Sequence, residues 1–208
     1  MTGRSKRGAA GRGLKLLAEL RVLLRAEVNP ERMLRSVAAL LARTGDYCIA
    51  DMTDDQGVLR RLEVAHADAS RREKLRIVAA ETLLGTRGRV ASLLAGGGSE
   101  RIAHVTRGAA AGTLADIVLL ANERVSSYMA TSVSVSGAPL AVLTIVSVRA
   151  TRRFTPEDLA FLAVIADWTG LGLENALRRQ LQPRESVAPP PTVDATAAGS
   201  RLKLGGRR

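Results

Sequence analysis

Leucine residues recur every three or four positions between residues 14 and 28. At about 100° per residue, this spacing brings Leu20 and Leu24 to the same face of an amphipathic helix. Asn29 and Pro30 follow directly. This pair is typical of a helix start, because asparagine caps free backbone N–H groups and proline fits the first helical position. The pattern therefore predicts two successive helices at the beginning of the domain.

Short apolar segments rich in β-branched residues then predict two β-hairpins. The first hairpin pairs residues 46–52 with residues 58–66, and the second lies within residues 128–149 around a turn at Gly137. The predicted elements between the hairpins are helices over residues 72–84, 87–95 and 113–124 and a short strand over residues 101–105.

A long helix is predicted from Pro156 to about residue 182. Thr155 is a suitable cap, and Glu157 and Asp158 lie in the positively polarised first turn. This helix has two apolar faces rather than one. The first face carries Leu159, Leu162, Ala163, Ala166, Gly170, Leu173 and Leu177, and the opposite face carries Phe161, Val164, Ile165, Trp168 and Leu171.

The carboxy-terminal pattern resembles that of GAF domains. The resemblance rests on the segment Gly137 to Leu143, on residues 154–159 (FTPEDL) and on residues 173–176 (LENA). It extends over about residues 15–181. It implies an α+β, GAF/PAS-like fold with a central antiparallel sheet of about five to six strands. The amino- and carboxy-terminal helices are then expected on one face of the sheet and the central helices on the other.

The second apolar face of the last helix needs a cover, because a large exposed apolar patch is a liability in a monomer. One reading is that the first helix of the same chain covers it. The other is that the first and last helices of two chains form a shared bundle, as the GAF resemblance implies. The residues expected in such a dimer interface are Phe161, Val164, Ile165, Trp168, Leu171, Leu20 and Leu24.

Side chains alternate along residues 128–136, and alternation places serines on one side of this strand. That side is expected to face the central helices, where GAF ligands bind. The candidate ligand-pocket residues are Tyr128, Ser132, Ser134, His66 and His104. The alternative is a plain sheet face without a ligand. Ser132 and Ala141 replace the proline and glycine common in the family, which bears on the pocket more than on the fold.

Composition and charge limit the function classes. No apolar run reaches the roughly 18–20 residues of a membrane span, and the lone Cys48 excludes an intrachain disulfide and fits the cytoplasm. The net charge is +11, but most of it lies in the two ends of the chain. We expect a disordered basic tail over residues 1–13, a GAF domain over residues 14–182, and a disordered Pro/Ala-rich basic tail over residues 183–208.

No catalytic constellation emerges from the sequence. His66 and His104 lie at the ends of different predicted strands, without metal-ligand spacing. Either histidine is a conceivable haem ligand, as in some GAF sensors, but no cofactor is assigned. Cys48 fits a small buried hydrophobe, and one cysteine does not match the free methionine sulfoxide reductases of the family. The cyclic-nucleotide signature and a P-loop are both absent.

These observations favour a non-catalytic GAF sensor that forms a homodimer through its terminal helices. It would signal to a protein partner that carries the output function, gated by an unidentified small molecule. The first alternative is a dimeric scaffold or nucleic-acid-associated protein that uses its basic tails. The second is a GAF fold with a purely structural role.

Overall fold

A computed structural model describes residues 3–68, 88–105 and 125–181, with side chains from residue 11 onward. It opens with helices α1 (Gly3–Ala26) and α2 (Pro30–Leu41). The Asn29 side chain accepts a hydrogen bond from the backbone N–H of Arg32 at 2.9 Å. The predicted cap and the proline at the first position therefore do begin the second helix.

Five strands form one antiparallel sheet. They are β1 (Tyr47–Thr53), β2 (Leu59–His66), β3 (Ser99–Ile102), β4 (Ser127–Val135) and β5 (Ala138–Ser147). Their order across the sheet is β2-β1-β5-β4-β3. Both predicted hairpins are present, and the antiparallel pairing of β1 with β5 joins them into one sheet. This is the α+β arrangement that the sequence predicted.

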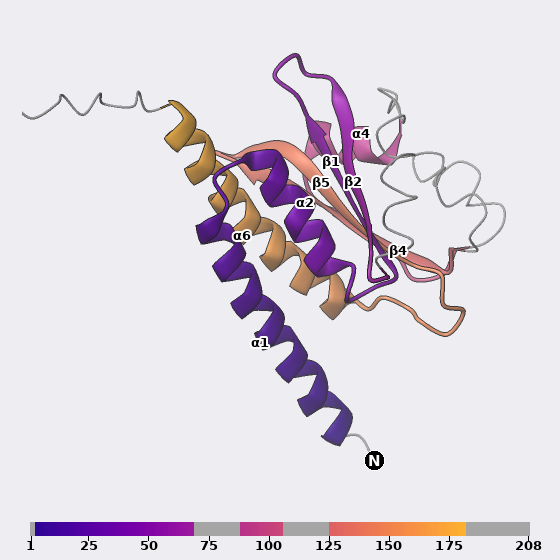
Figure 1. Cartoon of the computed structure of the whole chain (residues 1–208). Coiled ribbons are helices and arrows are strands. Elements are labelled where there is room, and N and C mark those ends of the chain that lie inside the picture. The colour runs from indigo at the N-terminus through magenta and orange to yellow at the C-terminus, as the bar shows by residue number, and fades with distance from the viewer. Residues whose placement is uncertain (1–2, 69–87, 106–124, 182–208) are drawn as a thin grey trace, which may run out of the picture.

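The helices lie in two layers (Figure 1). The long helix α6 (Pro156–Leu181) packs with α1 and α2 on one face of the sheet, and the short helix α4 (Arg89–Gly96) lies on the other. The terminal helices thus share a face, as expected. The helices predicted over residues 72–84 and 113–124 lie outside the described residues, as does the tail predicted over residues 183–208.

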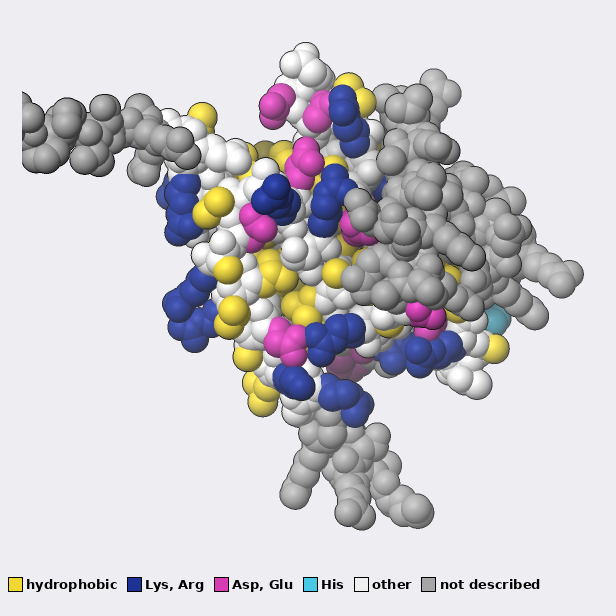
Figure 2. Space-filling model, in the orientation of Figure 1, with side chains coloured by type: hydrophobic (Ala, Val, Ile, Leu, Met, Phe, Trp, Pro, Cys, Tyr) yellow, Lys and Arg dark blue, Asp and Glu magenta, His cyan; other side chains and the backbone are white. Residues whose placement is uncertain are grey.

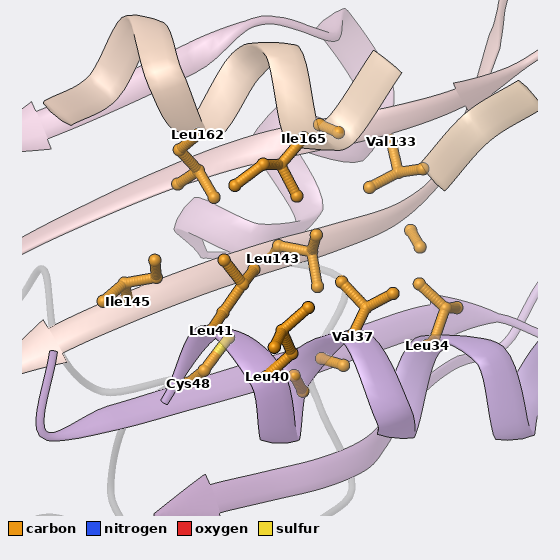
Figure 3. Packing of buried hydrophobic residues seen from close by; sticks show 14 of the residues in the cluster. Leu34, Val37, Leu40, Leu41, Cys48, Val133, Leu143, Ile145, Leu162 and Ile165 are labelled. Carbon is orange, nitrogen blue, oxygen red and sulfur yellow. The ribbon is translucent and has the colours of Figure 1, made fainter. Parts of the chain in front are cut away.

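Aliphatic side chains form the main core, between the sheet and the layer of α2 and α6 (Figure 3). Val37 and Leu41 point from α2 toward Leu143 on β5, and Leu162 and Ile165 reach the same strand from α6. Burying each such side chain contributes roughly 1.5–3 kcal/mol to folding. Leucine, isoleucine and valine therefore fill the space that aromatic side chains, only 2% of this sequence, do not.

Two element boundaries differ from the prediction. Helix α1 begins at Gly3, well before the expected start at residue 14, so residues 3–13 are helical where the sequence suggested a disordered tail. Alanine, arginine and lysine are good helix formers, and no proline interrupts this segment. The short strand predicted over residues 101–105 begins earlier and is β3.

Within the described ranges, none of the helices combines the length and hydrophobicity that crossing a membrane requires.

Both hairpins contain a register shift. In the first it falls between Ala50 and Asp51, and in the second between Val133 and Ser134. A shift of this kind places two residues of one strand opposite one of its neighbour and redirects the side chains that follow. The extra residues are Leu62 in β2 and Leu140 in β5, so side-chain alternation is interrupted in those two strands and continues along β1 and β4.

Candidate functional site

A cavity lies between the sheet and α4, on the face opposite the terminal helices. The space there is about 340 Å³ when open solvent at its mouth is included, and the part that a water-sized molecule can occupy is about 20 Å³. Strands β1, β2, β3, β4 and β5 and helix α4 all contribute to it. Its described lining consists of Ile49, Asp51, Arg61, Arg89, Val90, Leu93, Glu100, Tyr128, Ala130 and Thr144.

An ion pair is buried in one wall of this cavity. Asp51 and Arg61 are direct partners across the β1–β2 hairpin, next to the extra residue Leu62 of β2. The Arg61 Nε donates to Asp51 Oδ1 at 2.9 Å, and the two side chains are 0% and 1% exposed. Buried charges are costly unless they are paired and hydrogen-bonded. This wall therefore presents a fixed polar surface in otherwise apolar strands.

A second polar cluster, centred on Glu100 of β3, forms another part of the lining. The Tyr128 hydroxyl donates to Glu100 Oε1 at 2.5 Å, and Arg89 Nη1 lies 2.6 Å from the same oxygen. Arg89 is the first residue of α4, so this carboxylate links the helix to β3 and β4. Half-exposed Arg89 and mostly buried Glu100 bring one charge of each sign to the cavity.

Apolar side chains separate these two polar clusters. Val90 and Leu93 of α4 pack against Ala130 of β4 and Val142 of β5. Ile49 belongs to a neighbouring apolar cluster that also contains Tyr128. A concave site with apolar walls and a few fixed polar groups is the usual form of a small-molecule site. The described lining combines polar and apolar groups in the same way.

The predicted pocket residues do not come together. Tyr128 lines the cavity, but Ser132 accepts a hydrogen bond from the Gly98 N–H at 2.9 Å, and Ser134 is exposed near the end of β4. The His66 ring packs on Tyr47 with 4.7 Å between ring centroids, and His104 is exposed. Of the five predicted residues, only Tyr128 is in the described lining of this cavity.

The sequence reasoning missed the charged residues of the lining, which are Asp51, Arg61, Arg89 and Glu100. A signal for two of them was present. Asp51 and Arg61 are charged residues in predicted strands, on either side of a predicted turn at residues 54–57. Counting outward from that turn brings them near one another across the hairpin.

Cys48 lies on the other face of the sheet, within the apolar core beneath α2. Burial raises the pKa of its thiol, and the negative charges of Asp51 and Glu63 raise it further. The neutral thiol is therefore the stable form, as expected for a cysteine that serves as a small hydrophobe. Among the described residues no group of three or more His, Cys, Asp or Glu has the arrangement of a metal site.

The last helix is buried on more sides than the sequence indicated. Leu20 and Ile165 are both 0% exposed, so they belong to the core of one chain and are corrected as dimer-interface residues. The wheel placed Ile165 on the second apolar face, but its side chain points into the core toward Leu143 of β5 (Figure 3). A β-carbon at Gly13 would lie 3.6 Å from the Phe161 ring, and one at Gly172 would lie 2.9 Å from Leu24.

These two contacts also show that α1 and α6 run parallel, side by side. Beyond them, apolar side chains reach the surface of both helices. Val164, Trp168 and Leu171 on α6 are exposed. On α1, Leu14 and Val22 are also exposed, with exposed fractions of 70% and 68%. In Figure 2, hydrophobic side chains follow this side of the molecule among lysine and arginine side chains. We call these five residues the outer strip.

Comparisons with known proteins agree with this geometry. The GAF domain of a phosphoenolpyruvate-protein phosphotransferase from Coxiella burnetii is similar, with a TM-score of 0.60 and 18% identity over 81% of this chain and 96% of that one. Free methionine-R-sulfoxide reductase from Neisseria meningitidis, in complex with its substrate, has a TM-score of 0.63 and 16% identity over 82% and 93%. The GAF-B domain of DevS from Mycobacterium smegmatis has a TM-score of 0.54 and 16% identity over 73% and 98%.

At these identities, the solved structures establish the fold alone. No curated protein sequence matches the chain. The GAF domain family model, in contrast, matches residues 29–173, which is most of the chain and includes every described residue of the cavity lining. The chain therefore belongs to the GAF domain family.

Proposed function

We propose that this chain is a non-catalytic GAF sensor, which binds a small molecule in the cavity beneath α4 and acts as a homodimer through α1 and α6. The observation that carries the proposal is the cavity itself. It combines a buried ion pair, a second charged cluster and apolar walls in one concave site. GAF domains are commonly sensory or regulatory modules. A methyl-accepting chemotaxis protein is among the similar structures and is a precedent for signalling.

The position of the single cysteine supports a binding role over a reductase role. One similar structure is a methionine sulfoxide reductase, and the fold can therefore support catalysis. In this chain Cys48 is buried on the opposite face of the sheet from the cavity. Thiol chemistry requires a thiolate that the substrate can reach. A ligand in the cavity would instead contact the Asp51–Arg61 and Arg89–Glu100 ion pairs and the Tyr128 side chain.

The outer strip supports the dimer. Val164, Trp168 and Leu171 follow one another at intervals of four and three residues, which is the spacing of a coiled-coil seam. Leu14 and Val22 on the parallel helix α1 widen this surface. A second copy offers the same strip, so a symmetric contact between two copies would bury both. A cytoplasmic protein partner would then respond to changes in the angle between the paired helices.

Native mass spectrometry of the full chain, purified without denaturation, tests the ligand. We expect a defined additional mass on the wild-type protein. Ala130→Leu adds bulk at the cavity wall and should reduce the fraction carrying that mass, whereas Ser134→Ala, on the same strand but exposed, should not. A wild-type protein that never carries additional mass, even after incubation with a metabolite extract, would count against the sensing role.

Oligomeric state over a concentration series tests the dimer. Leu171→Glu places a charge in the outer strip and should convert dimer to monomer. The matched control is Val58→Glu, because Val58 is also an exposed apolar residue but lies at the tip of the β1–β2 hairpin. Monomeric wild-type protein at all concentrations, or equal effects of both variants, would refute the proposed interface.

A second candidate function rests on the exposed basic residues of α1, which are Arg12, Lys15, Arg21 and Arg25. A basic helix can bind the phosphate backbone of nucleic acid, and such binding weakens steeply with salt. Fluorescence anisotropy with duplex DNA at low and at physiological salt, on wild type and on a variant with these four residues changed to glutamine, tests it. Salt-sensitive binding lost in the variant would favour this function.

A further inference from the structure

We propose that β3 relays changes in the cavity to the start of α6, with Arg101 as the positioning residue that makes the connection. The cavity and the terminal helices lie on opposite faces of the sheet, so a sensor of this architecture must carry its response across the sheet. The inference rests on the proposed sensing role and assigns it a route.

Two consecutive residues of β3 face the two sides. Glu100 lines the cavity and holds both Arg89 and the Tyr128 hydroxyl. The next residue, Arg101, reaches the other way and donates from Nη1 to the backbone oxygen of Phe154 at 3.0 Å. Adjacent residues of a strand point to opposite faces of the sheet. Any displacement of this strand therefore moves the cavity contact and the Phe154 contact together.

The contact at Phe154 lies immediately before α6. Thr155 caps this helix: its Oγ1 accepts from the Asp158 N–H at 3.2 Å, and the Asp158 carboxylate accepts from the Thr155 N–H at 2.9 Å. The Phe154 side chain is 1% exposed and belongs to the main core. Phe154 is therefore fixed between the main core and the capping box of α6. A displacement of Arg101 that moves the Phe154 carbonyl would act directly on the start of this helix.

Among the five strands, β3 is the one best placed to move. It has four residues and lies at the end of the strand order, where it pairs with β4. Gly97 and Gly98 precede it with φ angles of +67° and +96°, values that glycine adopts without strain. Thr144, the cavity residue of β5, is instead held between β1 and β4. Gly98 is bonded to Ser132 of β4, so the two strands move together at that end, but a short strand paired on one side has fewer bonds to strain than a central strand paired on both.

Hydrogen exchange on the full chain, read at the first turns of α6, tests the relay without a known ligand. Glu100→Ala removes both cavity contacts of β3 and serves as the perturbation. We expect Glu100→Ala to change the hydrogen-exchange rates of the first α6 amides by about threefold or more when Arg101 is present. In the Arg101→Ala background, the same change should have little effect on these rates. Arg101→Lys, which keeps one donor for the Phe154 oxygen, should restore part of the response.

The control is Arg153→Ala, because exposed Arg153 lies in the same connection but donates to its neighbour Arg152. Glu100→Ala should act equally with and without this change. Additive effects of Glu100→Ala and Arg101→Ala would overturn the relay, as would an unchanged α6 in Glu100→Ala. Native mass spectrometry of the same variants tests the proposed sensor separately. A protein without bound mass that is also monomeric refutes the sensor, whereas the hydrogen-exchange data alone decide whether β3 and α6 are coupled.

Discussion

Gly170 of α6 lies against the backbone of Ser134 in β4, so closely that a β-carbon at position 170 would be 2.2 Å from the Ser134 carbonyl oxygen. No side chain intervenes at this point between helix and strand. Ser134 lies next to the register shift of the β4–β5 hairpin, where Leu140 is the extra residue of β5. The glycine therefore sets how near α6 can approach the sheet.

Gly170→Ala should destabilise the protein by about 2–3 kcal/mol, because backbone must move to admit the methyl group and overpacking of this kind is costly. The control is Gly13→Ala in α1, where a β-carbon would meet only the Phe161 ring at 3.6 Å. Alanine at that position should be neutral or stabilising by up to about 1 kcal/mol, through its helix propensity. Urea unfolding curves of the two variants decide the matter, and equal effects would contradict the close approach.

Asp46 makes stability depend on pH. Burial alone would raise the pKa of its carboxyl, but hydrogen bonds from the Ser147 hydroxyl and the Val148 N–H, both at 2.8 Å, and the charge of Arg149 lower it overall. A depressed folded-state pKa contributes stability above the unfolded pKa of about 3.9, and that contribution is lost as pH falls through the folded value. These bonds join the start of β1 to the end of β5.

We therefore expect Asp46→Asn to cost about 2 kcal/mol at neutral pH, since hydrogen bonds to a charged group are stronger than neutral ones. The difference from wild type should stay constant down to about pH 5 and shrink below about pH 4 as wild-type Asp46 becomes protonated. Unfolding measured from pH 3 to pH 7 provides the test. A difference that is the same across this whole range would exclude the carboxylate as its source.

The sequence predicted the elements well because capping residues and apolar periods are local signals. Asn29 and Pro30 marked the second helix, and Thr155 and Pro156 marked the last one. The orientation of α6 was harder to predict. A wheel identifies opposite faces but not which neighbours cover them, and Ile165, which had been assigned to the dimer interface, points into the core of its own chain.

The candidate site was predicted poorly for a different reason. Alternation placed Ser132 and Ser134 on the same side of β4 as Tyr128, but Ser134 is exposed near the end of the strand, and Ser132 is bonded to Gly98. The charged lining depends on pairing between strands. Asp51 meets Arg61 because the hairpin pairs Thr53 with Leu59, one residue further along β2 than the predicted turn at residues 54–57 implies, and a single sequence does not fix this register.

The buried Asp51–Arg61 pair gives a test of how the cavity wall is held. Arg61→Met alone should destabilise the protein by about 3–5 kcal/mol, because it leaves the buried Asp51 carboxylate without its cation. The double variant Asp51→Leu/Arg61→Met should recover most of this loss, since the apolar replacements no longer bury a charge. A double-mutant cycle by urea denaturation measures the coupling, and additive losses would show that the two side chains act independently.

Cys48 distinguishes a structural thiol from a reactive one. Its side chain is fully buried in the core, and burial together with nearby carboxylates raises the pKa of the thiol. The folded protein should therefore react with a thiol reagent such as DTNB only as fast as it opens, and added urea should accelerate the reaction in step with the unfolded fraction. Rapid labelling of the folded protein at neutral pH would contradict this burial, and it would reopen the question of thiol chemistry in this GAF domain.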